Sequence, residues 1–157
     1  MSHTPPCPDG HADTDRPVHA LDIPALLVVG TMRAWVAPLV KPGHEHPNWR
    51  EILRLAGVPG EGAQGFNRLM EVVAGHARRL IEVRCCQCPA LGEDEVHMLS
   101  LMGALQQGDA FTPVRILTDW LPAGQVTPAL ASAQRFAAIL AVQGLHLPGP
   151  ARPALMH

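Results

Sequence analysis

The sequence predicts an all-α protein: a single compact domain of five to six helices with disordered N- and C-terminal tails. No stretch alternates for long between apolar and polar residues, β-branched residues are sparse, and helix start and stop signals recur along the chain. With 157 residues, of which 47% are hydrophobic, the chain can form a core without disulfides. We expect a disordered lead over residues 1–20, a helical domain over 21–147 and a flexible tail over 148–157.

Two helices are expected in the first part of the domain. The first begins after Asp22, a cap residue that is followed by Pro24 in the first turn. The second is short and begins at Asn48, which has the spacing of a capping box to Glu51. Gly57 then provides a stop signal for this second helix.

The most regular apolar stripe of the chain lies in the next segment. A glycine-rich loop is expected over 57–65, and a helix is expected over 65–84. Its buried face would carry a row of apolar residues at helical spacing: Phe66, Leu69, Met70, Val73, Ala77, Leu80 and Ile81.

The remaining helices are predicted from their first turns. Gly92 precedes three acidic residues that suit the positive end of a helix, which would run to about Gln107. Thr112-Pro113 and Thr127-Pro128 each place a hydroxyl cap before a proline at the first helical position. The last helix would end at Gly144.

Charge and hydropathy exclude several classes of function. Residues 23–40 are apolar enough to suggest a membrane span, but Arg33 near the centre favours a buried helix instead. The net charge is −2, so nucleic acid is an unlikely partner on electrostatic grounds. Three serines without a nucleophile motif predict no serine hydrolase, and the chain offers no set of catalytic residues. We therefore expect a non-enzymatic protein.

A weaker alternative is a DNA-binding regulator. Residues 53–58 resemble the first helix and turn of a helix-turn-helix, and the following helix offers polar side chains for DNA contacts: Asn67, Arg68, Arg78 and Arg79. The glycine-rich, acidic stretch after residue 58 disfavours this alternative, because a recognition helix should begin within a few residues.

Three of the four cysteines lie together as Cys85, Cys86 and Cys88. Thiolates bind soft or borderline metals, and zinc commonly takes four nitrogen or sulfur ligands. With His97 in the next predicted helix, these cysteines provide a full ligand set within a short stretch. Histidines from elsewhere could complete or replace it: His76 on the preceding helix, and His44 and His46 in a loop.

Two other interpretations of the cysteines remain open. A reactive thiol would be favoured by nearby arginines and opposed by the acidic run at 93–95. Cysteines also pack as small apolar residues in cores, and this is the simpler interpretation. The clustering does not resemble the disulfide framework of a secreted protein, so a reducing cytoplasm is expected.

The sequence thus leads to two expectations for function. The first is a bacterial-type cytoplasmic interaction or regulatory protein, because few charges and apolar helices indicate a protein partner or a homo-oligomer. The second is a metal-binding or thiol-based sensor or accessory protein that uses the cysteine cluster with zinc or another soft or borderline metal.

Overall fold

The computed structural model describes residues 17–149, and this part of the chain is an all-α domain. It contains one short 3₁₀ turn, Val18–Ala20, and six α-helices. The prediction of a compact domain of five to six helices is confirmed. The helices are α1 (Ile23–Val40), α2 (Trp49–Leu55), α3 (Gly60–His76), α4 (Glu93–Gln106), α5 (Phe111–Trp120) and α6 (Ala123–Val142).

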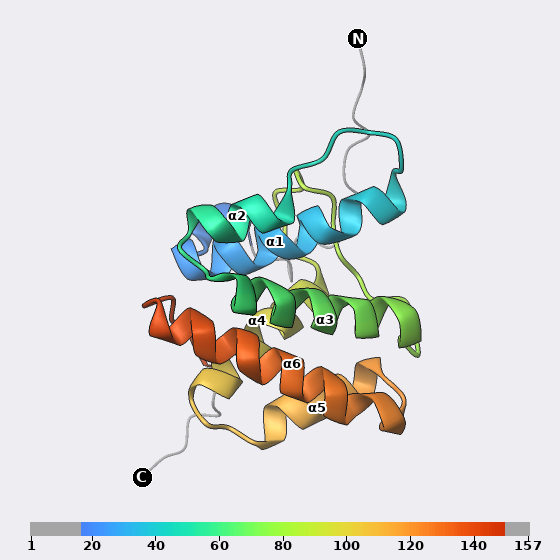
Figure 1. The fold of residues 1–157 in the computed structure, drawn as a ribbon. Helices are drawn as coiled ribbons and strands as arrows, with labels where there is room; N and C mark the ends of the chain where they lie inside the picture. Colours follow the sequence, from blue (N-terminus) through green and yellow to red (C-terminus); the bar gives the residue numbers. More distant parts are fainter. Residues whose placement is uncertain (1–16, 150–157) are drawn as a thin grey trace.

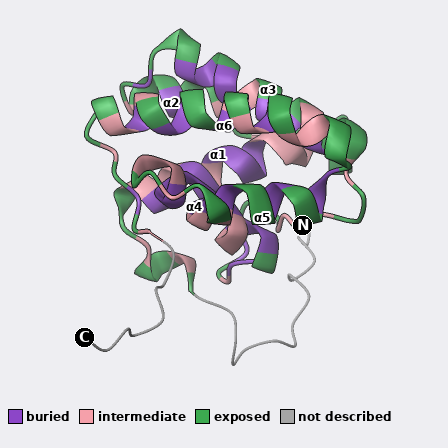
Figure 2. Cartoon of the chain, turned by 90° about the horizontal axis from the view of Figure 1, so that it is seen from below, coloured by how far each residue is buried: buried purple, intermediate pink, exposed green. Residues whose placement is uncertain are grey.

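The helices enclose one core (Figure 1). α3 runs along α6 through the middle of the view, α1 and α2 lie on one side of this pair, and α5 lies on the other. Phe66 of α3 and Phe136 of α6 meet with ring centroids 5.0 Å apart, and both are fully buried. Figure 2 shows that the buried residues lie on the faces that the helices turn toward each other, as amphipathic helices in one domain require.

The starts of the first two helices agree with the sequence. The Asp22 carboxylate accepts a hydrogen bond from the Ala25 amide at 3.1 Å, and Pro24 lies in the first turn of α1. The Asn48 side chain accepts hydrogen bonds from the amides of Arg50 and Glu51. These caps satisfy amide groups that have no partner within the helix.

The start predicted for α3 is wrong, because the helix begins at Gly60 and not at 65. The glycines after Pro59 do not form a loop. Gly62 and Gly65 are buried and let α3 approach α6 closely: a Cβ on Gly65 would lie 3.2 Å from the Ser132 carbonyl oxygen. Close helix packing therefore outweighs the low helix propensity of glycine.

The predicted end of α3 is also wrong, because the helix stops at His76 and not near 84. Leu80, which the apolar stripe placed in the core, is 90% exposed. The chain leaves the helical path where the Arg78 amide donates to the Trp120 carbonyl oxygen at 2.8 Å. A tertiary contact thus ends the helix before the apolar periodicity does.

The two Thr-Pro pairs are not the helix caps that the sequence indicated. Asp109 caps α5 by accepting hydrogen bonds from the amides of Phe111 and Thr112. α6 begins after Pro122, so Thr127-Pro128 lies inside it. Both helices therefore start before their Thr-Pro pairs.

α1 is the one described helix that is long and apolar enough to cross a membrane. Core helices of soluble proteins have the same length and apolar composition, so these two properties do not indicate a membrane span by themselves. In the structure, α1 contributes fully or nearly fully buried side chains to the core: Ala25, Val28, Val29, Met32 and Ala34. The described residues offer no clear membrane span.

The chain after α6 is held against the end of α4. Leu147 is 4% exposed, and its amide donates to the Gln106 side-chain oxygen at 2.7 Å. Most of the two segments that were predicted to be disordered, 1–20 and 148–157, lies outside the described residues, so that prediction is not tested.

Candidate functional site

The clustered cysteines lie on segment 77–92, which links α3 to α4 without a helix or a strand. Near its start, the Arg78 amide donates to the Trp120 carbonyl. Near its end, the Pro89 carbonyl accepts from the Val18 amide at 2.7 Å. The helix predicted over 65–84 would have ended directly before Cys85, but α3 ends at His76 and the cysteines lie well beyond it.

A buried arginine of α1 holds this segment. Arg33, which is 3% exposed, donates two parallel hydrogen bonds to the Glu95 carboxylate, at 2.7 and 2.9 Å. It also donates to the carbonyl oxygens of Cys88 at 2.8 Å and Ala90 at 2.9 Å. Burial opposes the charge of Arg33, but the Glu95 carboxylate outweighs burial, so the pKa of Arg33 lies above its ordinary value.

Glu95 completes the link between α1, the cysteine segment and α4. Besides Arg33, its carboxylate accepts from the Arg84 amide at 3.1 Å and from the Gly92 amide at 2.8 Å. Glu95 is fully buried, and a carboxylate there is tolerated because its oxygens have charged and polar donors.

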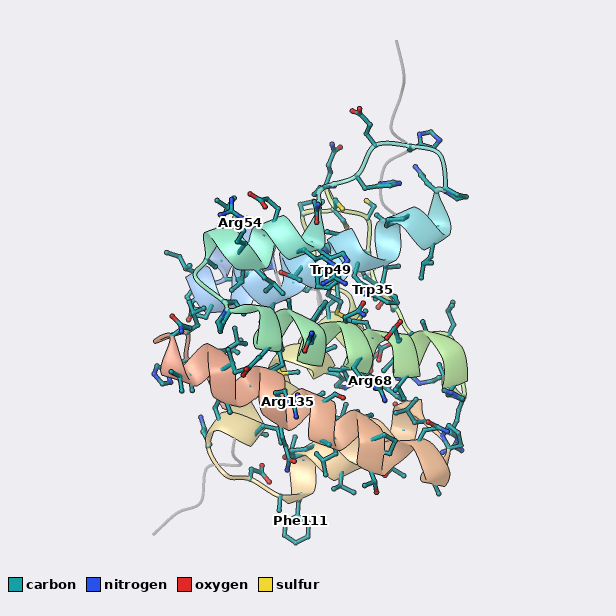
Figure 3. All side chains as sticks on the ribbon, viewed as in Figure 1. Trp35, Trp49, Arg54, Arg68, Phe111 and Arg135 are labelled. Atoms are coloured by element: carbon teal, nitrogen blue, oxygen red, sulfur yellow. The ribbon has the colours of Figure 1, made fainter. Side chains whose placement is uncertain are left out.

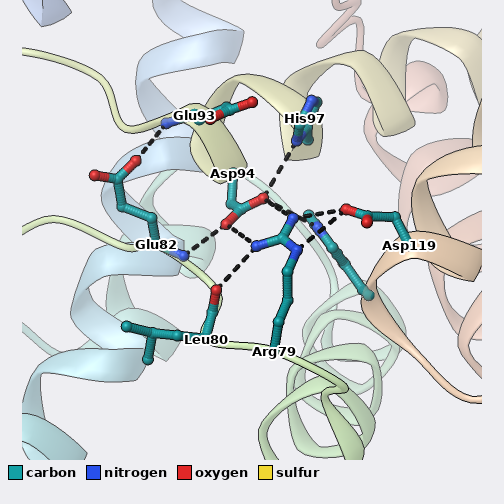
Figure 4. Close-up of polar contacts among 8 residues, drawn as sticks. Arg79, Leu80, Glu82, Glu93, Asp94, His97 and Asp119 are labelled. Carbon is teal, nitrogen blue, oxygen red and sulfur yellow. Dashed lines mark hydrogen bonds and ion pairs between the residues drawn. The ribbon is translucent and has the colours of Figure 1, made fainter. Parts of the chain in front are cut away.

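A second network is centred on Asp94 (Figure 4). Its carboxylate accepts two hydrogen bonds from Arg79, at 2.9 and 2.7 Å, and one from the Glu82 amide at 2.7 Å. The Trp120 indole donates at 3.1 Å, and His97 Nδ1 lies 3.2 Å from the same carboxylate. The network therefore joins α4, segment 77–92 and the end of α5.

The surroundings of Asp94 keep it ionised. Burial raises the pKa of its carboxyl, but the hydrogen bonds from Arg79 and the other donors outweigh burial and hold that pKa well below its usual range. Arg79 also pairs with the exposed Asp119 at 2.7 Å, and both carboxylates raise the pKa of Arg79.

Sequence reasoning missed this role of the acidic run. The run was explained as the favourable first turn of a helix, but only Glu93 is exposed there, whereas Asp94 is 2% exposed and Glu95 is fully buried. The signal that could have found them is Arg33, because a charged residue inside an apolar helix needs a buried partner.

The three cysteines have different environments. Cys88 is 3% exposed, and its sulfur lies 4.0 Å from Arg84 Nη1. Cys85 and Cys86 are exposed, and none of the three cysteines forms a disulfide within residues 17–149. Burial raises the pKa of Cys86 more than the charge of Arg33 lowers it. Cys86 is therefore less ionised at neutral pH than an ordinary cysteine.

The predicted metal ligands are not brought together in this arrangement. His97 contacts Asp94, and His76 is exposed at the end of α3. Within residues 17–149, no three His, Cys, Asp or Glu side chains are placed so that they could hold a metal ion. Metal binding by Cys85, Cys86, Cys88 and His97 stays a prediction.

Four of the predicted residues nevertheless line one cavity of about 510 Å³, which we name the thiol cavity. Cys85 and Cys86 line it together with His44 and His46 from the loop after α1. His46 Nε2 lies 2.8 Å from the Lys41 carbonyl oxygen, which fixes this ring at the cavity. The His44 and His46 ring centroids are 6.5 Å apart.

An apolar hollow lies next to the thiol cavity, and we name it the α1–α3 groove. Its volume is about 340 Å³, and it shares Val36 and Val83 with the thiol cavity. Leu39 and Leu80 lie at the groove and are 62% and 90% exposed. The other apolar residues that line it come from α1, α3, segment 77–92, α4 and α5: Met32, Trp35, Met70, Val73, Ala74, Ala77, Ile81, Met98 and Trp120.

The residues considered for DNA contacts are mostly engaged within the protein. Arg79 pairs with Asp94, and Arg78 donates to the Thr118 carbonyl at 3.0 Å. Asn67 accepts a hydrogen bond from the Trp35 indole at 2.8 Å. α3 begins at Gly60, soon after α2 ends at Leu55, so the long glycine-rich loop that disfavoured a helix-turn-helix is not present between them. Arg68 is the exception, because it is exposed and has no hydrogen-bond or ion-pair partner among residues 17–149. One free guanidinium is less than a recognition helix needs to read several base edges.

Comparisons with family models, with curated proteins and with solved structures found no match to this chain.

Proposed function

We propose that this protein is a non-enzymatic cytoplasmic interaction or regulatory protein, and that its α1–α3 groove binds the same surface of a second copy of the chain. One observation carries the proposal. Leu80 projects almost fully exposed beside an apolar hollow that it also lines. In a two-fold symmetric dimer, each copy presents the same surface to the other. The projecting side chain of one copy can then enter the hollow of the other copy, and the reverse contact forms at the same time.

The surroundings of the groove favour apolar contact. Leu39 and Val40 at the end of α1 are 62% and 68% exposed, and they extend the apolar surface from the groove to the thiol cavity. Adjacent exposed apolar residues of this kind are typical of interaction surfaces, whereas isolated ones need no explanation.

Charge also permits pairing with a second copy. Lys41 and Glu45, of opposite sign, both line the thiol cavity beside the apolar surface. Arg84 and Glu82 pair at 3.4 Å on the neighbouring segment. Because these charges balance locally and the net charge of the chain is only −2, two copies meet little repulsion.

The proposal is tested by sedimentation velocity over a range of concentrations. The wild-type chain should associate to a dimer, and Leu80→Glu should shift the equilibrium toward monomer by about tenfold or more, because each dimer buries the introduced charge twice. Phe111→Glu is the matched control, since Phe111 is 88% exposed and lies at the start of α5, away from the groove (Figure 3).

Two results would count against this proposal. A wild-type chain that stays monomeric at high concentration would exclude self-association. A dimer that Phe111→Glu weakens as much as Leu80→Glu does would place the interface on another surface.

A second candidate function is a soft-metal or thiol-based sensor at the thiol cavity. Two exposed thiols and two imidazoles line that cavity together, and this observation favours the candidate because zinc binds both kinds of ligand. In this version, Cys85 and Cys86 bind the metal together with His44 and His46, and binding requires the loop after α1 to rearrange and the His46 contact with Lys41 to break. Cys88 and His97 then have structural roles.

Cobalt titration of the reduced protein tests this candidate, because cobalt bound to thiolates absorbs visibly. Cys85→Ser with Cys86→Ser should abolish the absorbance, His44→Ala with His46→Ala should weaken binding, and His97→Ala should leave it unchanged. Absence of binding, or loss of binding only in the His97 variant, would rule out this set of ligands.

A further inference from the structure

A separate hollow of about 440 Å³ lies between α2, α3 and α6, and we name it the arginine pocket. Three small residues are among those that line it, Gly65 of α3 and Ala131 and Ser132 of α6. Their short side chains leave space where α3 and α6 approach closely. The pocket shares no lining residue with the thiol cavity or the α1–α3 groove.

Three arginines from three helices line this pocket. They are Arg50 of α2, Arg68 of α3 and Arg135 of α6. Figure 3 shows Arg68 and Arg135 on the face that α3 and α6 form together. Within residues 17–149, neither of these two guanidinium groups has a hydrogen-bond or ion-pair partner. Arg50 lies over the Trp49 ring, 4.3 Å from its centroid, and this contact limits its orientations.

The other polar groups of the pocket include several donors. The Asn67 side-chain oxygen accepts from the Trp35 indole, and this contact leaves the amide NH₂ of Asn67 to donate elsewhere. Gln64 and Ser132 add an amide and a hydroxyl. Glu71 is the one carboxylate that lines the pocket, against three guanidinium groups.

We propose that the arginine pocket binds a small phosphate-containing anion, through Arg50, Arg68 and Arg135 with the amide of Asn67. Guanidinium groups bind phosphate oxygens through paired hydrogen bonds, and three of them that line one pocket from different helices suit a group with several charged oxygens. The size of the pocket fits a phosphate or diphosphate group with a small organic substituent.

Titration calorimetry with inorganic pyrophosphate tests this site. The wild-type chain should bind pyrophosphate, and Arg68→Gln with Arg135→Gln should weaken binding by about tenfold or more, because charge-assisted hydrogen bonds are lost. Glu71→Gln should strengthen binding, since it removes the one opposing charge. The Arg68 and Arg135 side chains have no hydrogen-bond or ion-pair partner among residues 17–149, so the double variant should stay folded, which circular dichroism checks.

The control is Arg115→Gln, an exposed arginine of α5 that does not line the pocket. Its affinity for pyrophosphate should match that of the wild type. The proposal is overturned if the wild type shows no binding at millimolar pyrophosphate, if Arg115→Gln weakens binding as much as the double variant does, or if Glu71→Gln weakens it. Loss of self-association would not affect any of these results, because the groove and the pocket are separate.

Discussion

Two adjacent carboxylates of α4 connect parts of the chain that are distant in sequence. Glu95 pairs with Arg33 of α1, and Asp94 pairs with Arg79 before the cysteines. Both acids are almost fully buried, and each has several donors. A buried charge is costly unless it is paired, so loss of one partner is more damaging than loss of a surface pair.

The Arg33–Glu95 pair should therefore be sensitive to substitution. Glu95→Gln keeps the side-chain shape but leaves the Arg33 charge buried without its counterion, and we expect the free energy of unfolding to fall by about 3–5 kcal/mol. Urea denaturation measures this change. Glu51→Gln is the control, because Glu51 pairs with Arg54 on the surface and should cost less than about 1 kcal/mol. Equal losses in the two variants would contradict the structural role of Glu95.

Asp94 should make stability depend on pH. Its folded-state pKa lies below its unfolded value, so its ionised form stabilises the fold at neutral pH. This contribution should be lost as the pH falls from about 4, the ordinary pKa of an aspartate, toward the lower folded-state pKa.

Comparison with Asp94→Asn isolates this contribution from those of other acids. At neutral pH we expect the variant to be less stable by about 1–3 kcal/mol, because it loses charged hydrogen bonds. The difference between the two urea-unfolding free energies should narrow on acidification below about pH 4. A difference that stays constant or widens there would mean that Asp94 does not carry the effect.

At the scale of the helices, the contact between α3 and α6 depends on glycine. A Cβ on Gly65 would lie 3.2 Å from the Ser132 carbonyl oxygen and 3.4 Å from the Phe136 amide nitrogen. Both neighbours belong to the backbone of α6, so they cannot move without shifting the helix. The space between these two helices is therefore set by the absence of a side chain.

Alanine substitutions in α3 should accordingly have opposite effects. Gly65→Ala should lower the free energy of unfolding by about 1–3 kcal/mol, because it overpacks the contact with α6. Gly75→Ala in the same helix has open space and should raise stability by up to about 1 kcal/mol, because alanine favours helix. Thermal or urea unfolding compares the two, and stabilisation by both would show that α6 does not constrain Gly65.

Local signals predicted some helix ends and not others. Asp22 and Asn48 cap α1 and α2 as their side chains indicate, since capping depends on neighbouring amides alone. Both ends of α3 were missed, because they depend on packing with α6 and on the bond from Arg78 to the Trp120 carbonyl. Contacts between distant segments are not visible in the periodicity of one helix.

At the scale of the whole molecule, residues 17–149 form hollows on different sides of one core. The thiol cavity and the α1–α3 groove adjoin at the end of α1, and the arginine pocket lies between α2, α3 and α6. The sequence singled out Cys85, Cys86, His44 and His46 as candidate metal ligands, but it did not predict the cavity that they line. The apolar composition predicted an interaction surface without locating it. The arginine pocket could not be predicted, because its arginines come from three helices whose packing the sequence does not reveal.

The central claim, that two copies meet through the α1–α3 groove, is tested most directly by isotope-filtered NMR. A mixture of labelled and unlabelled chains reports only contacts between copies. The proposal predicts intermolecular contacts from the Leu80 methyl groups to groove residues of the other copy, such as Val73 and Met70, which line the groove. Absence of intermolecular contacts at concentrations where the protein should be dimeric, or contacts from Phe111 instead, would contradict it.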